Sequence, residues 1–369
     1  MTKIKNKMEV CFVPAHPSYG AVSMMRYWHH LMAVRRPSDR YDIQTVIPSD
    51  VYSGVAKRQS TLLRALHRKV AYPVRIKNRV GSAAFAHVLD HSWADMLAFV
   101  PSGVKKVVTV HDLIPLRYPG ALSAAQLKRF RLTVEWLKRA DALISVSEYT
   151  KREIIHWLQI DPLKIHVVPN GTSLEEGAEA TNGRVATVLK ERSDHFRVGS
   201  LGSILQRKNL GIFSKALAKV EAVGGRAPIL VRAGMKVDDE LADEFSRAFG
   251  EDGWLELGSL DRNELEQFYR GIDVLVIPSF YEGFGLPVLE AMARGVPVLA
   301  ADSSSLPEVG GDAALYFSPD SPDELAERLE SLSDPVLYER LSREGLQRAR
   351  EFSWRRTLEG LYDVYDRLQ

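Results

Sequence analysis

Short apolar runs rich in β-branched residues alternate with helix-like segments along nearly the whole chain, and this alternation constrains the fold more than any other feature. Such runs are typical of buried strands in parallel sheets. Strands that alternate with helices predict doubly wound parallel sheets, and two series of six runs predict two Rossmann-like domains in an α/β chain. The predicted strands of the first series are residues 10–15, 43–47, 84–89, 104–110, 142–146 and 165–168, and those of the second are residues 196–201, 229–233, 254–257, 272–277, 296–301 and 314–317.

The boundary between the two domains is predicted at a polar stretch near the middle of the chain. Residues 171–184 (GTSLEEGAEATNGR) are small, polar and glycine-bearing, as expected of an interdomain linker. We therefore expect an N-terminal domain over residues 1–180 and a C-terminal domain over residues 181–352.

The composition is that of an ordinary globular protein. With 369 residues, 45% of them hydrophobic, the chain can form two domains with full cores, and its formal net charge of +2 gives no global attraction to nucleic acid. The single cysteine, Cys11, excludes an intramolecular disulfide and a cysteine-based metal cluster. The amino terminus does not resemble a secretory signal, and no run of about 18 apolar residues occurs. We expect a cytoplasmic protein, with peripheral contact on the inner face of the plasma membrane left open.

The segment 278–295 (PSFYEGFGLPVLEAMARG) places two carboxylates around a glycine turn and a helix start. The run 272–277 predicts a strand before it, and Pro287 suits the first turn of a helix that ends at Gly295. The turn therefore follows the carboxyl end of a strand. Ligands bind at that end in open α/β sheets, and the free N–H groups of a helix start attract phosphate.

The two carboxylates have different expected roles. Glu282 lies in the turn, where it can accept hydrogen bonds from the hydroxyls of a sugar, and Glu290 lies about one turn into the helix, within reach of a vicinal diol. Gly283 and Gly285 allow the backbone to approach a ligand closely. The alternative for two isolated glutamates is a helix-terminal charge and a solvated face. The strand, the Gly-Phe-Gly turn and the proline together favour the binding site.

This E-x7-E segment resembles the signature of retaining glycosyltransferases of the GT-B fold, in the large family four that includes mannosyl- and glucosyltransferases of bacterial polysaccharide assembly. The resemblance implies two Rossmann-like domains that face a central cleft, with the donor mainly on the second domain and the acceptor on the first. It also implies that a C-terminal helix, residues 353–369, packs back on the first domain, although two ordinary terminal helices remain the alternative. Phe284, Gly285 and Leu286 are then expected to bind the donor.

A second motif follows the strand that ends near residue 201. A turn that begins with Gly202 leads to the adjacent cations Arg207 and Lys208. Arginine offers a diphosphate a bidentate fork and lysine a point charge, although such pairs are more often solvated surface. The run is similar to the family's Gly-Thr-x-x-Pro-Arg-Lys-Asn motif, with Gln206 in place of the usual proline.

Two features of the N-terminal half also resemble the family. His111 follows a predicted strand, as does the histidine of the family's His-Asp motif, which reaches the donor sugar and the reaction centre. Asp112 either orients this ring or caps the following turn. Gly20 lies where the family carries a glycine-rich loop facing the donor phosphates, but the second glycine usual there is absent, which leaves the positioning of the acceptor open.

A long stretch of the N-terminal half carries basic residues and no acid. Its charges fit either a solvated face or a contact with anionic lipid headgroups or a lipid-linked diphosphate, where each basic residue contributes about 1 kcal/mol. Nucleic acid is not expected, because no recognised binding module or aromatic ladder accompanies the charges. The basic residues are Lys57, Arg58, Arg64, Arg68, Lys69, Arg75, Lys77 and Arg79.

Together these motifs predict a retaining hexosyltransferase of polysaccharide or lipopolysaccharide assembly that uses a nucleotide-diphosphate sugar, with GDP-mannose favoured by resemblance alone. Arg207, Lys208 and the helix start would stabilise the charge on the leaving diphosphate, so neither a metal ion nor another cofactor is expected. The resemblance implies that Glu282 holds donor-sugar hydroxyls, Glu290 the ribose and His111 a hydroxyl near the anomeric carbon. No carboxylate is assignable as a covalent nucleophile, which favours same-face attack assisted by the leaving phosphate.

Other proteins share such a two-domain fold, and the fold alone does not separate them. A phosphorylase needs a lysine-bound pyridoxal phosphate, and a sugar-nucleotide epimerase acts without an acceptor. A two-lobed sugar-binding protein, which is not an enzyme, also has two Rossmann-like halves but is usually exported. A nicotinamide dehydrogenase is disfavoured because no G-x-G-x-x-G follows a predicted strand. The nucleotide base and the acceptor stay open.

Overall fold

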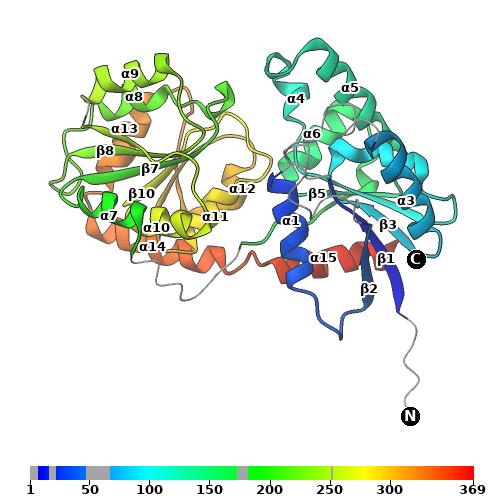
Figure 1. The fold of residues 1–369 in the computed structure, drawn as a ribbon. Helices are drawn as coiled ribbons and strands as arrows, with labels where there is room; N and C mark the ends of the chain where they lie inside the picture. Colours follow the sequence, from blue (N-terminus) through cyan, green and yellow to red (C-terminus); the bar gives the residue numbers. More distant parts are fainter. Residues whose placement is uncertain (1–6, 16–21, 47–66, 173–181, 251) are drawn as a thin grey trace. The chain divides into compact units, whose positions relative to one another are not determined.

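The chain forms two compact units, each built around its own six-stranded sheet (Figure 1). The computed structural model describes residues 7–15, 22–46, 67–172, 182–250 and 252–369. Unit 1 comprises residues 1–171 together with 354–369, and unit 2 comprises residues 172–353. Every pairing between neighbouring strands of the two sheets is parallel, so the predicted class of doubly wound α/β domains is confirmed.

The sheet of unit 1 has the strand order β2-β1-β3-β4-β5-β6. Because β1 lies between β2 and β3, the direction of winding reverses beside β1, and such a switch point is where doubly wound sheets bind ligands. Its strands are β1 (Met8–Val13), β2 (Tyr41–Thr45), β3 (Phe85–Val88), β4 (Lys105–Val110), β5 (Ala142–Ser145) and β6 (Ile165–Val167).

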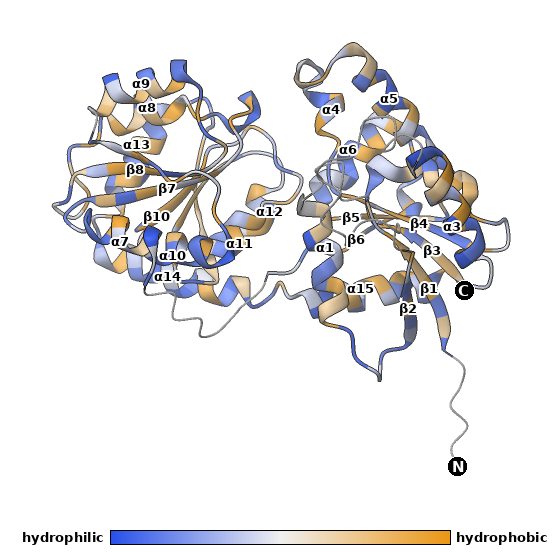
Figure 2. Cartoon of the chain, viewed as in Figure 1, coloured by the Kyte–Doolittle hydropathy of each residue, from blue (hydrophilic) through white to orange (hydrophobic). Residues whose placement is uncertain are grey.

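Both faces of this sheet are buried. Val10 and Phe12 of β1 belong to one apolar cluster, which contains residues of α1 and α15, whereas Cys11 and Val13 belong to another, which contains residues of α3 and η4. Alternate residues of a strand point to opposite faces, so burial on both sides requires the continuous apolar runs seen in the sequence. Figure 2 shows the strands as mostly hydrophobic.

The helical elements of unit 1 lie on the two faces of its sheet and in its connecting loops. They are α1 (Val22–Ala33), the π-helical turn η3 (His67–Ala71), α3 (Tyr72–Val80), η4 (His91–Phe99), α4 (Ile114–Arg117), η5 (Pro119–Ala121), α5 (Ala124–Val134), η6 (Glu135–Arg139), α6 (Glu148–Leu158), η7 (Pro162–Lys164) and α15 (Trp354–Arg367).

The sheet of unit 2 has the strand order β12-β11-β10-β7-β8-β9. Here β7 is flanked by β10 and β8, so the winding reverses between β7 and β10. The two strands pair in register through Val198 with Val274 and Gly199 with Leu275. The strands are β7 (Phe196–Gly202), β8 (Pro228–Gly234), β9 (Trp254–Glu256), β10 (Val274–Ile277), β11 (Val298–Ala301) and β12 (Leu315–Phe317).

The helices of unit 2 complete the second doubly wound domain. They are α7 (Arg184–Lys190), η8 (Gln206–Lys208), α8 (Ile212–Leu217), α9 (Asp239–Phe249), α10 (Arg262–Gly271), α11 (Leu286–Met292), α12 (Leu306–Gly310), η9 (Gly311–Ala313), α13 (Pro322–Ser331) and α14 (Pro335–Ala349).

The C-terminal helix α15 packs on the sheet of unit 1. Its apolar face buries Leu358 and Leu361, and the buried hydroxyl of Tyr365 lies 2.6 Å from Nδ1 of His87 on β3. Thr357 donates a hydrogen bond to the carbonyl of Pro169 at 2.8 Å. The helix therefore contributes both apolar burial and specific polar contacts to a unit whose other residues all lie before residue 172.

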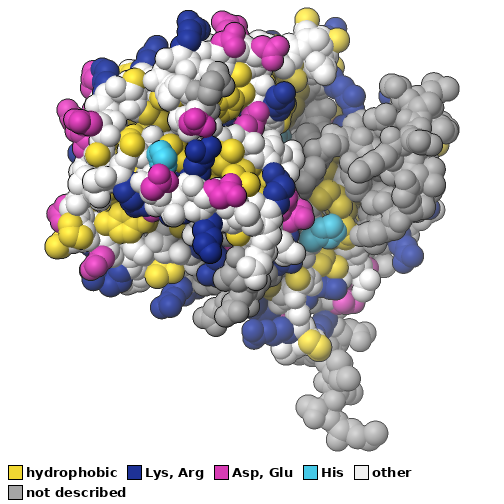
Figure 3. Space-filling view, turned by 60° about the vertical axis from the view of Figure 1, so that its left-hand side comes forward, with side chains coloured by type: hydrophobic (Ala, Val, Ile, Leu, Met, Phe, Trp, Pro, Cys, Tyr) yellow, Lys and Arg dark blue, Asp and Glu magenta, His cyan; other side chains and the backbone are white. Residues whose placement is uncertain are grey.

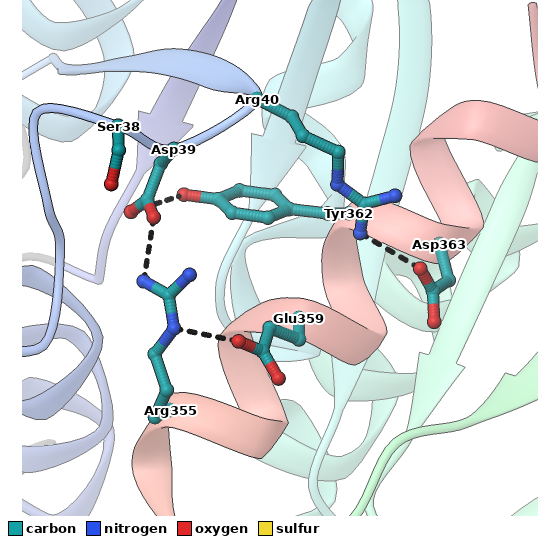
Figure 4. Close-up of a pocket in the computed structure, with 7 residues that line it drawn as sticks. All are labelled: Ser38, Asp39, Arg40, Arg355, Glu359, Tyr362 and Asp363. Carbon is teal, nitrogen blue, oxygen red and sulfur yellow. Dashed lines mark hydrogen bonds and ion pairs between the residues drawn. The ribbon is translucent and has the colours of Figure 1, made fainter.

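The buried carboxylate of Asp39 joins α15 to the loop before β2 (Figure 4). Oδ2 of Asp39 accepts from the Tyr362 hydroxyl at 3.1 Å, and Oδ1 pairs with Arg355 at 2.6 Å. Arg355 also donates to Glu359 at 2.8 Å, and these side chains line a pocket of about 310 Å³. Burial alone raises the pKa of Asp39, but hydrogen bonds from the Arg36 amide and from Arg355 outweigh it and lower the pKa.

Replacing Asp39 by asparagine keeps the shape of the side chain but removes its charge. We expect Asp39→Asn to lower the free energy of unfolding by about 1–3 kcal/mol at pH 7. A lowered pKa means that the carboxylate stabilises the fold above its unfolded pKa of about 3.9, and that this contribution is lost as the pH falls through the folded value. The difference between the variant and the wild type should therefore shrink below about pH 4.

Urea unfolding at pH 7 and at pH 3.5, a value chosen just below the ordinary aspartate pKa of about 3.9, measures this effect. Asp42→Asn is the control, because Asp42 is exposed and Gln44 is the one hydrogen-bond donor to its carboxylate within the described part of the chain. If Asp39→Asn destabilises the protein no more than the control does at both pH values, Asp39 does not stabilise the fold as a buried, ionised partner of Arg355.

Candidate active site

The predicted cation motif and the predicted carboxylate turn lie side by side at the carboxyl edge of the unit 2 sheet. The loop after β7 runs from Gly202 to η8, and the turn after β10 runs from Pro278 to Gly285. The amide of Phe280 donates to the carbonyl of Arg207 at 2.8 Å, which ties the two segments together. Because β7 and β10 flank the switch point, this edge is where an open sheet binds its ligand.

Glu282 is the centre of a buried charge cluster. Its Oε1 accepts from Lys208 Nζ at 2.6 Å and from the Ser279 hydroxyl at 2.7 Å, and its Oε2 lies 3.6 Å from Arg207. The three charged side chains are each only 14% exposed. Burial alone raises the pKa of Glu282, but the charges of Lys208 and Arg207 and the two hydrogen bonds lower it below its usual value. The carboxylate is therefore ionised at neutral pH.

Three consecutive serines after β11 hold the backbone of the Glu282 turn. Ser303 donates to the carbonyl of Ser279 at 2.7 Å, and the Ser304 hydroxyl accepts from the amide of Glu282 at 2.9 Å. Ser305 donates to the carbonyls of Glu282 and Phe284 at 2.9 and 2.8 Å. Ser304 has φ +53°, which is uncommon for a residue other than glycine and is supported here by the contact of its hydroxyl.

Arg207 combines one firm contact with one buried donor that lacks a partner. Its Nη1 donates to the carbonyl of Tyr281 at 3.1 Å, whereas its buried Nε has no hydrogen-bond partner among the described residues. Asn209, in the left-handed region at φ +55°, donates to the carbonyls of Pro278 and Pro319 and so holds η8 against the turn. An unpartnered buried N–H is costly, and an anion would satisfy it.

Two of the predicted donor-binding glycines have backbone conformations that favour glycine. Gly202 has φ +133°, and a Cβ there would lie 3.4 Å from Lys208 Nζ. Gly285 has φ +104°, and a Cβ there would lie 3.0 Å from Leu306 Cδ2. Phe284 is buried edge-to-face against Phe352, so its side chain supports the turn.

The remaining predicted donor residues of unit 2 lie on α11. Leu286 begins the helix and is half-buried, and Glu290 lies one turn further along, also half-buried. Oε2 of Glu290 accepts from the hydroxyl of Tyr269 on α10 at 2.7 Å. The structure thus brings Gly202, Arg207, Lys208 and Glu282 into one cluster, while Gly285 ends the same turn beside Leu306 and Glu290 occupies a second position beside α10.

His111 follows β4 in unit 1 and is buried. Its Nε2 lies 2.9 Å from the carbonyl of Leu89, and its ring packs edge-to-face against Tyr27. Burial is the largest influence on its pKa and lowers it, so the ring is neutral at pH 7. Of the two roles left open for Asp112, the structure shows the cap, because its Oδ1 accepts from the amide of Ile114 at 3.1 Å. Gly20 lies outside the described residues.

The basic stretch is divided by the structure into cations with partners and cations that face solvent. Arg68 donates to Asp95 at 3.1 Å, and its guanidinium lies 4.1 Å from the centroid of the Trp93 ring. Arg75 also has interaction partners. Lys69, Lys77 and Arg79 are exposed. Lys57, Arg58 and Arg64 lie outside the described residues.

Two exposed valines accompany these cations. Val70 precedes α3 and is 51% exposed, and Val74, one turn later, is 53% exposed. By contrast, the face of unit 2 seen in Figure 3 carries acidic and basic side chains interspersed. Among the described residues no helix is long and apolar enough to cross a membrane.

Comparison with known proteins finds relatives over both units. Residues 26–176 match the family model "Glycosyltransferase Family 4", and residues 186–348 match the model "Glycosyl transferases group 1". The chain is 30% identical over 334 residues to a D-inositol 3-phosphate glycosyltransferase of Actinosynnema mirum, covering 85% of this chain and 79% of that protein. It is 28% identical over 263 residues to the O-antigen chain mannosyltransferase B of Escherichia coli, covering 69% of each chain.

Solved structures share the fold over the full length. The sucrose-phosphate synthase of Thermosynechococcus elongatus superposes with a TM-score of 0.74 at 20% identity, covering 98% of this chain and 99% of that one. The HepE protein of Anabaena, in complex with UDP and glucose, superposes with a TM-score of 0.72 at 16% identity, covering 97% and 99%. At these identities the likeness establishes the fold alone.

The buried pair of Lys208 and Glu282 should be strongly coupled in its effect on stability. Removing Glu282 leaves Lys208 and Arg207 as buried cations without their carboxylate, which costs about 3–5 kcal/mol, whereas removing Lys208 leaves Glu282 paired with Arg207 at 3.6 Å. We therefore expect Glu282→Gln to destabilise the protein more than Lys208→Met, and the double variant, which has one unpaired cation instead of two, to be less destabilised than the sum of the two. Unfolding free energies of the wild type and the three variants form the double-mutant cycle. Additive effects would show that the pair is not coupled.

Proposed function

Because the chain belongs to the family 4 glycosyltransferases, we propose that it transfers a hexose from a nucleotide-diphosphate sugar, with retention of configuration and without a metal ion, to a glycan or lipid-linked acceptor. Both family models match, one in each unit, and the GT-B fold class predicted from the sequence is confirmed. Glycosyltransferase activity follows from the family. The donor, the acceptor, retention and metal independence are the content of the proposal.

The observation that carries the proposal is the pair of buried cations at the carboxyl edge of the unit 2 sheet. Arg207 and Lys208 share a single carboxylate, Glu282, so one positive charge is not compensated within this cluster. The Nε of Arg207 is in addition a buried donor without a partner among the described residues. A diphosphate bound there would supply the missing acceptor, and the same fixed cations would stabilise the charge that develops as it leaves.

Metal independence rests on the same two cations. Many transfers of this kind need a positive charge at the leaving diphosphate, and a fixed arginine and lysine provide one that requires no reorganisation during the reaction. We propose that Arg207 and Lys208 take this role together with the backbone amides of the turn before α11.

We propose retention without a covalent intermediate because the carboxylate beside the two cations already accepts two hydrogen bonds. Oε1 of Glu282 accepts from Lys208 and Ser279, so this group is better suited to hold a sugar hydroxyl through Oε2 than to attack the anomeric carbon. The proposed mechanism is therefore attack by the acceptor on the same face of the sugar from which the diphosphate leaves, assisted by the leaving phosphate. For His111, donation from Nε2–H to Leu89 leaves Nδ1 as the acceptor for a sugar hydroxyl.

The donor is proposed to be GDP-mannose. The support is the name of the E. coli relative, an O-antigen chain mannosyltransferase, which also suggests assembly of a polysaccharide or lipopolysaccharide. UDP-glucose is the alternative, since the HepE structure contains UDP and glucose. The named relatives are transferases and synthases, so the epimerase, phosphorylase and binding-protein alternatives receive no support from them.

We further propose that the exposed face of η3 and α3 contacts an anionic membrane beside a lipid-linked acceptor. Lys69, Lys77 and Arg79 would contact lipid phosphates, each contributing about 1 kcal/mol, and Val70 and Val74 would enter the interfacial region. Arg68 takes no part, because Asp95 and Trp93 already engage it.

Removing either cation should slow transfer in a variant that still folds, because Glu282 keeps the other cation as a partner. We expect Arg207→Ala and Lys208→Ala each to lower kcat by about 10- to 1000-fold, by analogy with removing one donor that stabilises developing charge. Transfer from GDP-mannose and from UDP-glucose is measured side by side, with product configuration read by NMR. Lys215→Ala, which removes an exposed lysine of α8, is the control of equal charge change.

The same assay in excess chelator tests metal independence, and activity should persist. Loss of activity that magnesium or manganese restores would overturn this part of the proposal. Small effects of both Arg207→Ala and Lys208→Ala on kcat would show that the diphosphate binds elsewhere.

Vesicle binding should depend on the exposed cations of η3 and α3. We expect binding to rise with anionic lipid content and to fall with salt, since exposed charges are screened over about 8 Å at physiological ionic strength. Replacing Lys69, Lys77 and Arg79 by glutamine should reduce vesicle binding and transfer to a lipid-linked acceptor, while donor hydrolysis in solution is retained.

The matched control removes three exposed cations of unit 2 by the changes Lys190→Gln, Lys215→Gln and Arg343→Gln. Equal vesicle binding by the two triple variants would show that η3 and α3 form an ordinary solvated face.

A further inference from the structure

One oxygen of the Glu290 carboxylate is held by a buried tyrosine, and the other has no partner among the described residues. Tyr269, on α10, is fully buried, and its hydroxyl donates to Oε2 of Glu290 at 2.7 Å. An ionised carboxylate only accepts hydrogen bonds, so the tyrosine must be the donor. No contact within hydrogen-bond distance joins Oε1 of Glu290 to the part of the chain that the structure describes.

The tyrosine is itself fixed by its neighbours. The guanidinium of Arg294 lies 5.2 Å from the centroid of the Tyr269 ring and donates to the carbonyl of Glu290 at 2.7 Å. Arg294 is held in turn by Glu266, at 2.6 Å from Nε to Oε2, and Glu266 also pairs with Arg270 at 2.7 Å. Glu266 and Tyr269 lie one turn apart on α10, so this network joins α10 both to the carboxylate of Glu290 on α11 and to Arg294 just after that helix.

We propose that Tyr269 is a positioning residue for nucleotide binding, which orients Glu290 so that its carboxylate accepts the two vicinal hydroxyls of the donor ribose. This inference rests on the proposed function and on the ribose-binding role that the family resemblance implies for Glu290. A carboxylate has about four lone-pair sites, so one donor from Tyr269 leaves enough for a diol. Fixing the rotamer before binding removes the entropy that an unrestrained glutamate loses when a ligand orders it.

The geometry also assigns a direction to the contact. Tyr269 approaches Oε2, so Oε1 and the remaining lone pair of Oε2 are left to the ligand. A ribose that loses one hydroxyl leaves one of these acceptors without a donor, and a hydrogen bond to a charged group contributes about 1.5–3 kcal/mol. Discrimination between ribose and deoxyribose therefore reports on the orientation of this carboxylate.

The test combines Tyr269→Phe with ligands that lack one ribose hydroxyl. Calorimetric affinities are measured for GDP and UDP and for their 2′-deoxy and 3′-deoxy analogues. We expect the wild type to bind the ribonucleotide about 10- to 100-fold more tightly than the deoxynucleotides, which is the ratio that corresponds to about 1.5–3 kcal/mol. In Tyr269→Phe this ratio should fall to a few-fold, chiefly because the ribonucleotide binds more weakly.

Tyr338→Phe is the matched control. The Tyr338 hydroxyl donates to the carbonyl of Asp273 at 2.8 Å, so this variant also loses one tyrosine hydrogen bond in unit 2 but makes no contact with Glu290. Its thermal midpoint should change about as much as that of Tyr269→Phe, while its ribose discrimination should match that of the wild type. In a Glu290→Gln background, Tyr269→Phe should cause no further loss of discrimination.

The outcomes separate this inference from the function on which it rests. If the wild type discriminates and Tyr269→Phe discriminates equally, Tyr269 does not position Glu290, although the ribose assignment stands. If the wild type binds ribo- and deoxynucleotides alike, the ribose assignment of Glu290 fails and the inference fails with it. If Tyr269→Phe does not fold, the Glu290→Gln variant is decisive. A ratio of ribonucleotide to deoxynucleotide affinity in Glu290→Gln that equals the wild-type ratio would overturn both the ribose assignment and the inference.

Discussion

The parallel pairing of β7 with β10 is the constraint on which the unit 2 site depends. The sheet reverses its winding between these two strands, so no crossover helix covers the edge where both end. The cation motif after β7 and the carboxylate turn after β10 then meet, although Lys208 and Glu282 are 74 residues apart in sequence. Each further contact of the cluster follows from this adjacency, including the backbone bond between Phe280 and Arg207.

The electrostatics of the cluster follow from its burial. A carboxylate removed from water is costly, and here two cations and two hydrogen bonds offset that cost and keep Glu282 ionised. The serines after β11 fix the backbone of the same turn, so contacts within the fold itself hold the donors and charges in place. Such preorganisation is what allows a site to stabilise charge as it develops, since little has to move during the reaction.

Unit 1 shows how a run of like charges acquires different roles once its neighbours are known. Arg68 is enclosed by Asp95 and Trp93, whereas Lys69, the next residue, is exposed beside Val70. The same holds for Asp39, an ordinary residue of a short loop, which α15 converts into a buried ionic anchor by bringing Arg355 to it. In both cases the partner lies tens to hundreds of residues away along the chain.

The sequence by itself determined the two series of six strands, the parallel α/β class, the family, the positions of Arg207, Lys208 and Glu282 after strand ends, and that of Glu290 one turn into a helix. These follow from local signals, since apolar periodicity and turn residues act over a few neighbouring positions. Only the tertiary structure decided which side chains meet: Ser304 with the amide of Glu282, Tyr269 with Glu290, and Arg355 with Asp39. Such partners depend on strand order and helix packing, which arise from contacts between distant segments and leave no mark in local composition.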